Sequence, residues 1–387
     1  MSRKLKIVVT GQMAQYPLGG VTWFYLHYVL GFARLGHDVW YVEDSGQWPY
    51  NPTADGLVEG CEYNVQYLAG VMKRFGLDGK WAYCFPWQSQ WFGLDDARRR
   101  ELLESADILF NVSGTLERPW QYRPIPRLVY LDTDPVFTQV KLARGQADFR
   151  KLVDTHDVHF TYGERDSDAV PATGHRWLKT RTPVVLSEWR TGQPYREVFT
   201  TVMNWTSHNS VEYGGVRYGQ KDEEFRSYFD LPSMVAPTAL EIAMGSGKNE
   251  APPRALLEYK GWKLVDPNAV CPDLDSFRAY TESSKAEWGI AKNGYVRGQS
   301  GWFSERSARY LAAGRPVVVQ ETGFSDVLPV GEGILAFRTL DEAARGIREV
   351  EKNYQLHSRA ARKIAEEYFD SDKVLGQLLA EALNATE

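Results

Sequence analysis

Two aspartates at the end of a predicted buried strand are the carboxylates best placed for acid–base chemistry. Asp132 and Asp134 follow the apolar run 127–131 and are separated by one residue. In an extended chain the side chains of residues i and i+2 point the same way, so both can face one site. Such a carboxylate acts as the general base on an acceptor hydroxyl, or positions that hydroxyl. Because Pro135 follows, the pair also fits an Asp-Pro turn in which an aspartate caps its own backbone.

Three other side chains are weaker candidates for acid–base chemistry. Glu164 ends a later strand of the same half of the chain, and His208 follows the first strand of the second half. His27 lies among tyrosines and leucines in a predicted amphipathic helix, where a packed core histidine is the better interpretation. No Gly-x-Ser-x-Gly motif indicates Ser/His/Asp hydrolysis.

Two glycine-containing segments have the residue types that bind phosphate. Gly19 and Gly20 precede a predicted helix, whose free backbone N–H groups and dipole attract an anion. The segment Gly245-Ser246-Gly247-Lys248 adds a lysine charge to backbone donors. Thr206 and Ser207, at the end of the first strand of the second half, can line the same pocket. Both glycine segments are also explained as turns that need a positive φ or lie in solvent.

A third candidate phosphate site begins a helix that is predicted over 303–313. Ser300 and Gly301 precede the helix, Ser304 can cap it, and Arg306 lies in its first turn. A serine cap and a phosphate site use the same unpaired N–H groups, and an arginine can bind a pyrophosphate through two donors. The simpler interpretation of Arg306 is an exposed helical side chain.

The elements after this helix follow in a characteristic order. The helix ends at Gly314, and Pro316 opens a short β-branched strand over 317–319. A strand this short and apolar is typical of the buried interior of a parallel sheet. The polar loop Glu321-Thr322-Gly323 comes next, followed by a turn over 329–333 and another apolar run.

This order over 300–337 resembles the donor half of GT-B glycosyltransferases, closest in pattern to the retaining group 1, or family-4-like, enzymes. In that family the corresponding segment binds the nucleotide diphosphate of an activated sugar. The resemblance implies that Gly19 and Gly20 lie near the donor phosphates. It implies that the loop Glu321-Thr322-Gly323 abuts the sugar or diphosphate, and that Lys248 meets the diphosphate. A UDP-sugar is the implied substrate, and no cofactor is expected.

One position departs from the family pattern. Many members of the retaining branch carry a glutamate that holds the donor ribose where this chain has Arg309. The nearest acid in the predicted helix is Glu305. The resemblance therefore implies that the ribose contact passes to Glu305 or is made in another way.

Strand and helix patterns alternate in two series, which predicts an α/β chain with a doubly wound sheet in each half. Together with the resemblance, they predict a GT-B architecture in which two Rossmann-like domains face a central cleft. The predicted acceptor-side domain covers 1–180 and the predicted donor domain covers 198–365. The Pro-, Gly- and Thr-rich segment 181–197 is the predicted connection. A C-terminal helix over 366–387 is expected to pack back on the first domain.

Composition limits the class of protein. The chain has 387 residues, 43% hydrophobic and 25% charged, which is typical of a soluble globular protein of two domains. A formal net charge of −5 without a basic block makes nucleic acid an unfavoured partner, although one local patch would not show in it. The three cysteines lie far apart without metal-ligand spacing, which indicates a reducing compartment and no structural zinc. No segment approaches the length of a membrane-spanning helix, so we expect a cytoplasmic protein.

The predicted function is metal-independent transfer of a sugar from a nucleotide-diphosphate donor to a hydroxyl of a small molecule, a glycan or another acceptor. Helix N-termini, Lys248 and Arg306 would stabilise the leaving diphosphate. An epimerase-like enzyme of the same fold would instead turn over the donor alone, and a non-catalytic binding protein would leave it unchanged. Transfer to modified DNA bases is a minority alternative. Two aromatic loops, 47–60 and 81–92, either stack on a sugar ring or aglycone or cover the core.

Overall fold

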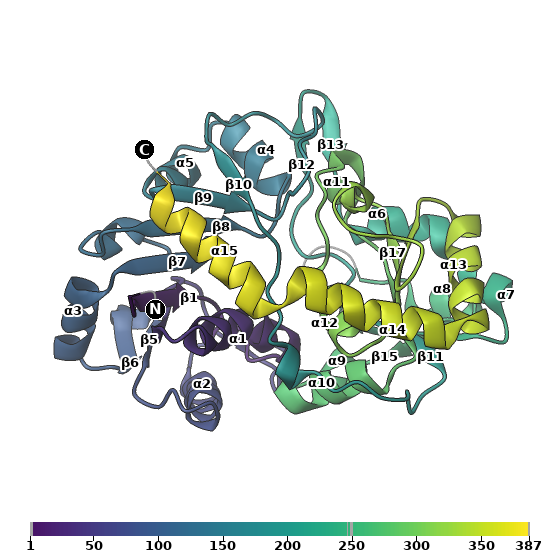
Figure 1. The fold of residues 1–387 in the computed structure, drawn as a ribbon, viewed down its shortest axis with the longest axis horizontal. Coiled ribbons are helices and arrows are strands. Elements are labelled where there is room, and N and C mark those ends of the chain that lie inside the picture. The colour runs from purple at the N-terminus through teal and green to yellow at the C-terminus, as the bar shows by residue number, and fades with distance from the viewer. Residues whose placement is uncertain (1–2, 246, 248–250, 386–387) are drawn as a thin grey trace.

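The computed structural model describes residues 3–245, 247 and 251–385, which form two halves, each built on a parallel sheet (Figure 1). The predicted α/β class is confirmed. Ser246 and Lys248, two of the predicted phosphate-binding residues, lie outside the described residues. None of the described helices is both long enough and apolar enough to cross a membrane.

The first half contains an eight-stranded sheet in the order β10-β9-β8-β7-β1-β2-β5-β6. All neighbouring strands are parallel except β6, which runs antiparallel to β5. The strands are β1 (Lys6–Thr10), β2 (Asp38–Glu43), β5 (Trp81–Phe85), β6 (Gln90–Gly93), β7 (Ile108–Val112), β8 (Leu128–Asp132), β9 (Val158–Thr161) and β10 (Trp177–Lys179). The helices are α1 (Gly19–Arg34), α2 (Glu62–Arg74), α3 (Asp96–Ser105), α4 (Phe137–Ala143) and α5 (Ala147–Asp154).

Helices cover both faces of this sheet, as a doubly wound pattern requires. Ile7 and Val9 of β1 belong to the apolar cluster that includes α1, whereas Val8 packs in a second cluster with Leu102 of α3. Successive strand residues face opposite sides, so the apolar centre of β1, Ile7 to Val9, is buried on both faces of the sheet.

The second half contains a six-stranded sheet in the order β15-β14-β11-β16-β17-β18, with every neighbouring pair parallel. The strands are β11 (Val198–Asn204), β14 (Ala239–Gly245), β15 (Lys263–Val265), β16 (Ala286–Gly289), β17 (Val317–Gln320) and β18 (Ile334–Phe337). The helices are α6 (Lys221–Phe225), α7 (Leu231–Val235), α8 (Arg254–Tyr259), α9 (Pro267–Val270), α10 (Leu274–Ser283), α11 (Asn293–Gly298), α12 (Glu305–Ala312) and α13 (Leu340–Lys352). The chain passes from the first sheet to the second between Lys179 and Val198; the exact domain bounds stay a prediction.

Two short hairpins stand outside the sheets. The first is β3 (Tyr50–Asn51) with β4 (Gly56–Leu57), and the second is β12 (Val211–Tyr213) with β13 (Val216–Tyr218). Neither the hairpins nor β6 is predicted from the sequence, because their aromatic and polar residues do not give a clear alternation. The second hairpin lies between β11 and α6 in the chain and packs on α4 of the first half.

The last helices return the chain to the first half. Figure 1 shows α14 (Tyr354–Ile364) along the second half and α15 (Ser371–Asn384) across the first. α15 packs on α1. Backbone hydrogen bonds of 2.7 and 2.9 Å join Val184 to Phe369 and to Ser371.

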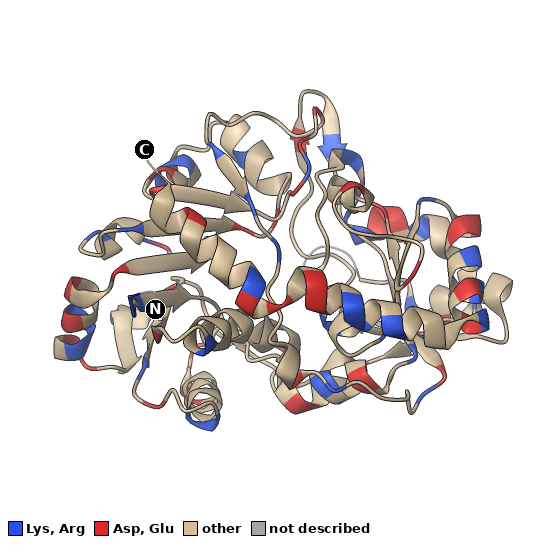
Figure 2. Cartoon of the chain, in the orientation of Figure 1, with Lys and Arg blue, Asp and Glu red and all other residues tan. Residues whose placement is uncertain are grey.

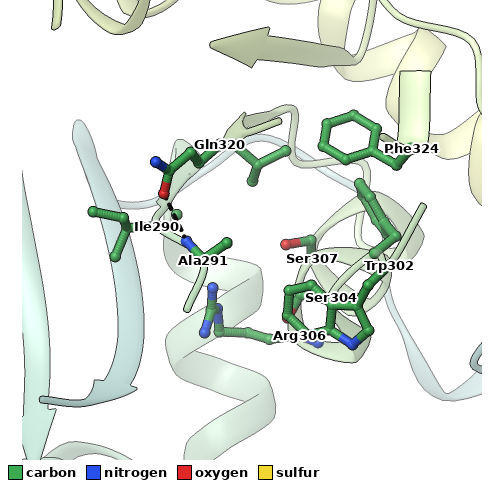
Figure 3. A pocket seen from close by; sticks show the side chains of 11 residues that line it. Ile290, Ala291, Trp302, Ser304, Arg306, Ser307, Gln320 and Phe324 are labelled. Atoms are coloured by element: carbon green, nitrogen blue, oxygen red, sulfur yellow. Dashed lines mark hydrogen bonds between the residues drawn. The ribbon is translucent and has the colours of Figure 1, made fainter. Parts of the chain in front are cut away.

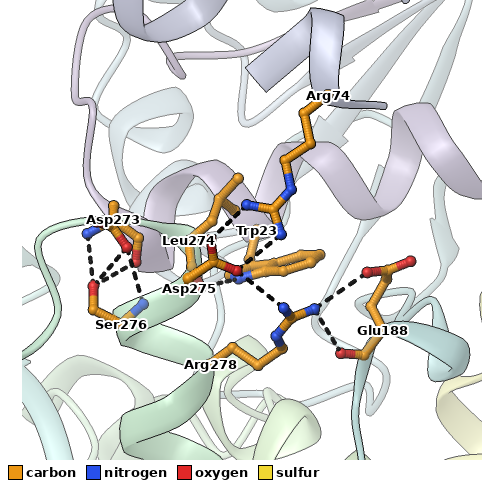
Figure 4. Close-up of polar contacts among 8 residues, drawn as sticks. All are labelled: Trp23, Arg74, Glu188, Asp273, Leu274, Asp275, Ser276 and Arg278. Carbon is orange, nitrogen blue, oxygen red and sulfur yellow. Dashed lines mark hydrogen bonds and ion pairs between the residues drawn. The ribbon is translucent and has the colours of Figure 1, made fainter. Parts of the chain in front are cut away.

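The two halves meet where α1 and α2 contact α10. Trp23 of α1 donates its ring N–H to the carbonyl of Leu274 at 2.9 Å (Figure 4). Arg278 of α10 lies over the Trp23 ring, 5.6 Å from its centroid. Arg74, the last residue of α2, makes paired hydrogen bonds of 2.6 and 2.8 Å with Asp275. An apolar cluster therefore continues from one half into the other, with charged pairs at its edge.

Gly19 sits at the closest point of this contact. A Cβ atom at Gly19 would lie 2.1 Å from the carbonyl oxygen of Asp273 and 2.6 Å from Cβ of Phe277. Both neighbours belong to well-packed structure, since Asp273 caps α10 and Phe277 is buried. The close approach of the two halves thus explains why position 19 holds a residue without a side chain.

The substitution Gly19→Ala tests this contact. We expect it to destabilise the folded chain by about 1–3 kcal/mol, because overpacking pushes the halves apart. Gly70→Ala is the control, since Gly70 lies in α2 and a Cβ there meets nothing within 4 Å. Alanine in a helix interior should stabilise by up to about 1 kcal/mol. Thermal unfolding measures both, and a Gly19→Ala midpoint at or above that of the unsubstituted chain would contradict the packing argument.

Candidate functional site

A cavity lies at the carboxyl ends of β16 and β17, next to the first turn of α12 (Figure 3). In doubly wound sheets this edge is where ligands bind. The apolar part of its wall comes from Ile290, Trp302, Phe303 and Phe324, and the polar part from Ser304, Arg306, Ser307 and Gln320. The hydroxyl of Ser307 and the ring N–H of Trp302 are buried without a hydrogen-bond partner among the described residues. Buried polar groups are normally bonded, so these two groups are available to a ligand or a water molecule in the cavity.

The glycines on either side of α12 let two loops lie in contact. Gly301 and Gly323 have φ values of +82° and +93°. A Cβ at Gly323 would lie 2.6 Å from the Gln299 carbonyl oxygen and 3.0 Å from the Gly301 nitrogen. The Gly301 N–H donates to the Thr322 carbonyl at 2.9 Å. These contacts place the segments 299–301 and 321–323 side by side at the end of β17.

Most polar atoms of these two loops are used inside the protein. Glu321 is buried and accepts the Gly323 N–H at 2.6 Å. The Thr322 hydroxyl donates to the Trp302 carbonyl. Ser304 caps α12 by accepting the Arg306 N–H at 3.3 Å. Ser300 differs, because its buried hydroxyl has no partner among the described residues. The loops therefore shape the start of α12, and Ser300 remains available to a ligand.

Arg306 is fixed by the sheet beneath it. Its Nε donates to Glu287 Oε1 at 2.5 Å, and its Nη1 donates to the Val202 carbonyl at 2.9 Å. Glu287 is completely buried, so this arginine neutralises an internal carboxylate as well as lining the cavity. Only part of the guanidinium is left for a bound phosphate.

Lys221, the first residue of α6, lies in electrostatic reach of Arg306 and Lys292. Burial, followed by the charges of these two cations, lowers the pKa of Lys221 from its usual 10.5 to about 7. No hydrogen bond or ion pair joins its ammonium group to another of the described residues. Lys221 is half-buried, and an anionic ligand would stabilise the charged form of an amine that lies near other cations.

Asp134 joins the two halves through three side chains of the second half. Its carboxylate accepts from Lys292 Nζ at 2.9 Å, lies 3.2 Å from His208 Nε2, and accepts from the Tyr295 hydroxyl. Burial opposes its ionisation, but the Lys292 charge and the His208 contact outweigh burial and hold the pKa of Asp134 well below its usual range. His208 also stacks edge-on against Phe137 of α4, with ring centroids 4.5 Å apart.

Asp132 turns inward, away from this cluster. Its carboxylate accepts from the Thr138 hydroxyl at 2.7 Å, the Gln139 amide at 2.9 Å and the Thr161 hydroxyl at 2.8 Å. It also accepts the Asp134 N–H at 3.1 Å, which is the Asp-capped turn that the sequence left open. Asp132 thus holds the loop after β8, and Asp134 is the aspartate that faces the second half.

Arg309 takes the place of the ribose-binding glutamate and contacts the first half. Its Nη1 donates to the Gly20 carbonyl at 2.7 Å, and its guanidinium lies 5.1 Å from the Phe277 ring centroid. Gly20 and Gly19 are accordingly packed on the second half. Glu305, one turn earlier, is partly exposed, and its carboxylate lies 3.9 Å from Arg309 Nη2.

The remaining predicted residues lie at the ends of β11 and β14. A Cβ at Gly247 would lie 1.8 Å from the Thr206 carbonyl oxygen, so the two strand-end loops touch. The Ser207 N–H donates to Gln220 Oε1 at 3.3 Å, directly before Lys221. These residues lie on the side of the candidate site that contains Lys221 and His208. Helix α12 and its loops lie on the side that contains the cavity.

Two of the three weaker acid–base candidates, Glu164 and His27, have structural partners. Glu164 pairs with Arg181, and burial, only partly offset by this arginine, raises the pKa of Glu164. His27 is buried and accepts the Val185 N–H at 3.1 Å. The site also includes Lys221, Lys292 and Tyr295, which sequence reasoning missed. Glycines lie near all three, but they form no recognised phosphate-binding motif, so only the fold reveals these residues.

Comparison with known proteins identifies the fold. No protein-family model matches the chain, and no curated protein matches its sequence. An alpha-glucosyltransferase in complex with UDP and a 13-mer DNA has a TM-score of 0.59 at 12% identity, over 98% of this chain and 100% of that one. Anabaena HepE in complex with UDP-glucose gives 0.59 at 13% identity, over 99% and 100%. Sucrose-phosphate synthase from Thermosynechococcus elongatus gives 0.56 at 12% identity, over 99% and 100%.

The chain therefore has the GT-B fold that these glycosyltransferases share. The match runs over nearly the whole length of each chain, so it covers both halves and not one Rossmann-like unit alone. The predicted architecture is confirmed. The roles of the individual site residues stay predictions.

Asp134→Asn tests the charge cluster between the halves. The substitution keeps the shape of the side chain but leaves Lys292, which is only 13% exposed, without its carboxylate. We expect a loss of about 1–3 kcal/mol in unfolding free energy, measured by thermal unfolding. Asp372→Asn is the matched control, because its ion pair with Arg34 is exposed on both sides. Equal effects of the two substitutions would show that the Asp134 cluster does not hold the halves together.

Proposed function

We propose that the chain is a glycosyltransferase that moves a sugar from a nucleotide-diphosphate donor, a UDP-sugar, to an acceptor hydroxyl. The observation that carries the proposal is the group of cations beside the α12 cavity, Lys221, Lys292 and Arg306. A nucleoside diphosphate combines a charged diphosphate with a flat base and a ribose. Cations next to a cavity with aromatic and polar walls fit that combination. Proteins of the same fold that hold UDP or UDP-glucose support the choice of donor.

In the proposed reaction the acceptor oxygen bonds to the anomeric carbon of the sugar. As the bond from that carbon to the diphosphate oxygen breaks, the proton of the acceptor hydroxyl passes, directly or through water, to the leaving diphosphate. Negative charge then builds on the leaving diphosphate. The N-terminus of α12 and the neighbouring cations can stabilise this charge without a metal ion. Among the described residues, no three His, Cys, Asp or Glu side chains are placed to hold a metal.

Asp134 is proposed to position groups in this reaction. A carboxylate whose pKa lies well below its usual range takes up a proton poorly, which makes it a weak general base. Its contacts with Lys292 and His208 instead fix those side chains at the junction of the two halves. We place the protein in the cytoplasm, because its three cysteines are free and buried.

Thermal unfolding against nucleoside diphosphates tests the donor site. UDP, GDP, dTDP and ADP are each added without metal and then with EDTA. At about a hundredfold excess over its Kd, a bound nucleotide adds roughly 2.7 kcal/mol of stability. We expect UDP to raise the midpoint by several degrees, with no loss of the shift in EDTA.

The result also separates the alternatives. No shift with any diphosphate would contradict the donor site and the transferase proposal. A UDP shift that EDTA abolishes would contradict the metal-independent mechanism. Turnover of a UDP-sugar to a second UDP-sugar without an acceptor would favour an epimerase-like enzyme, and binding without any turnover would favour a non-catalytic binding protein.

The lowered pKa of Lys221 predicts proton uptake on donor binding. At about pH 8 the free protein has this amine mostly neutral, because its pKa is about 7. A diphosphate stabilises the charged form and raises the pKa, so UDP binding takes up a proton. Affinity for UDP should therefore fall as the pH rises above 7. Calorimetry in buffers of different ionisation enthalpy measures the uptake.

Lys221→Arg is the matched variant for this measurement. Arginine stays charged at every pH of the assay, so UDP should still bind but without proton uptake at this position. Lys221→Ala should weaken UDP binding and remove the uptake as well. Equal proton uptake by the unsubstituted chain and Lys221→Arg would assign the proton to another group.

A further inference from the structure

Two tryptophans of the first half form an exposed aromatic surface. The side chain of Trp87 is 60% exposed and that of Trp48 is 38% exposed. Their ring centroids lie 6.4 Å apart with an interplanar angle of 35°, and Trp48 meets Phe85 edge-on at 5.6 Å. Large aromatic side chains that gather on a surface mark binding sites more often than single exposed ones do.

This surface lies at the ligand-binding edge of the first sheet. Trp48 follows the end of β2, and Trp87 follows the end of β5. Because β2 and β5 are parallel and Glu43 pairs with Tyr83, both segments leave the sheet at its carboxyl edge. The loop that carries Trp48 also reaches the second half, since Asn268 Nδ2 donates to the Tyr50 hydroxyl at 3.3 Å.

The loop that carries Trp48 is held by internal hydrogen bonds. Glu43 accepts the Ala14 N–H at 2.8 Å and the Gln15 N–H at 2.5 Å. Asn64 Nδ2 donates to the carbonyls of Ala14 and Tyr50 at 2.6 and 2.8 Å. The loop after β1 and the loop after β2 therefore form one unit, and the indole of Trp48 is presented by a fixed backbone.

The backbone after Trp87 is strained. Gln88 and Ser89 have φ values of +54° and +51°, in the left-handed region of backbone conformation that residues other than glycine rarely adopt. Two such residues in succession cost free energy, and proteins keep this kind of strain mainly at functional sites. Here it turns the chain so that Trp87 and its neighbours face outward, before β6 begins at Gln90.

The side chains next to the two indoles are uncharged, whereas the loop after β2 carries the acidic Asp44, Asp55 and Glu59, and the Glu117–Arg118 ion pair packs against Gly46. The exposed neighbours of the tryptophans are Gln47, Gln88, Ser89 and Gln90. The segments 44–72 and 81–97 contain no lysine or arginine. A nucleic-acid backbone or an anionic lipid surface would need cations at this place. A pyranose ring instead offers an apolar C–H face to an indole and hydroxyl groups to amides.

We infer that this aromatic surface, Trp48 and Trp87 with Gln47 and Gln88, binds a neutral glycan as the sugar acceptor. The inference rests on the proposed transferase function and names the class of its acceptor. The donor site lies in the second half, at β16, β17 and α12, whereas the aromatic surface belongs to the first half. Acceptor and donor binding can therefore be tested separately.

Trp87→Ala tests the inference, with Trp120→Ala as its control. Trp120 is 40% exposed, and its ring lies under the Lys151 ammonium of α5, in a segment that meets the loop after β2 through Tyr122 and Asp44. The full chain, with UDP present, is applied to an array of neutral mono- to tetrasaccharides, and each bound glycan is then titrated in solution. We expect Trp87→Ala and Trp48→Ala to weaken glycan binding at least tenfold, Trp87→Phe to retain part of it, and Trp120→Ala to leave it unchanged.

Measuring the affinity for UDP separates a failure of the acceptor inference from a failure of the proposed donor site. UDP binding, measured by calorimetry, should be the same in all four variants, which also shows that they are folded. If UDP binds but no neutral glycan does, or if glycan binding is insensitive to both tryptophans, the inference is overturned while the donor site stands. Salt-dependent binding of duplex DNA that is lost in Trp87→Ala would also overturn it, in favour of a nucleic-acid acceptor. If UDP itself does not bind, the proposed function fails first.

Discussion

The packing of α1 on α10 is the contact on which the arrangement of this molecule depends. Two parallel sheets can serve one ligand only if their carboxyl edges face each other, and this contact holds them so. Gly19 permits the backbones to approach, and Trp23 bonds to the backbone of α10. Arg309 then reaches from α12 to the Gly20 carbonyl. The Asp134 cluster adds a further contact between the halves, after the carboxyl end of β8.

The two halves differ in the chemistry that they bring to this junction. The second half supplies cations and a cavity at the start of α12, and its buried carboxylate Glu287 balances only one of those cations. The first half supplies Asp134 together with aromatic loops after β2 and β5 that contain no lysine or arginine. The cations of the second half suit the charged leaving group of a substrate. The aromatic loops of the first half suit an uncharged substrate with hydroxyl groups. In the proposed transferase, specificity for donor and acceptor would thus follow from how side chains are divided between two similar sheets.

The sequence predicted the fold because its signals are local. Gly314, Pro316 and the valines of β17 specify a helix end and a buried strand within a few residues of one another, and α12 with β17 appears where they indicate. The candidate site depends on residues far apart in the chain. Lys221 belongs to the site because the fold places it near Lys292, which follows β16. Asp134 differs from Asp132 in its contacts with three side chains that are distant in the sequence. Periodicity carries no information on such contacts, and Arg309, which departs from the family pattern, is explained only by its partner at Gly20.

Helix α15 completes the first half although it is synthesised after the second half. α15 covers α1, and Val184 is bonded to the segment that leads into α15. During synthesis the first sheet leaves the ribosome early, yet one side of α1 stays uncovered until the second half and α15 have followed. Domains of a nascent chain generally fold in order from the N-terminus. Here the first half reaches its final form only after the second, so a chain that ends before Ser371 would leave apolar residues of α1 open to chaperones or to other chains.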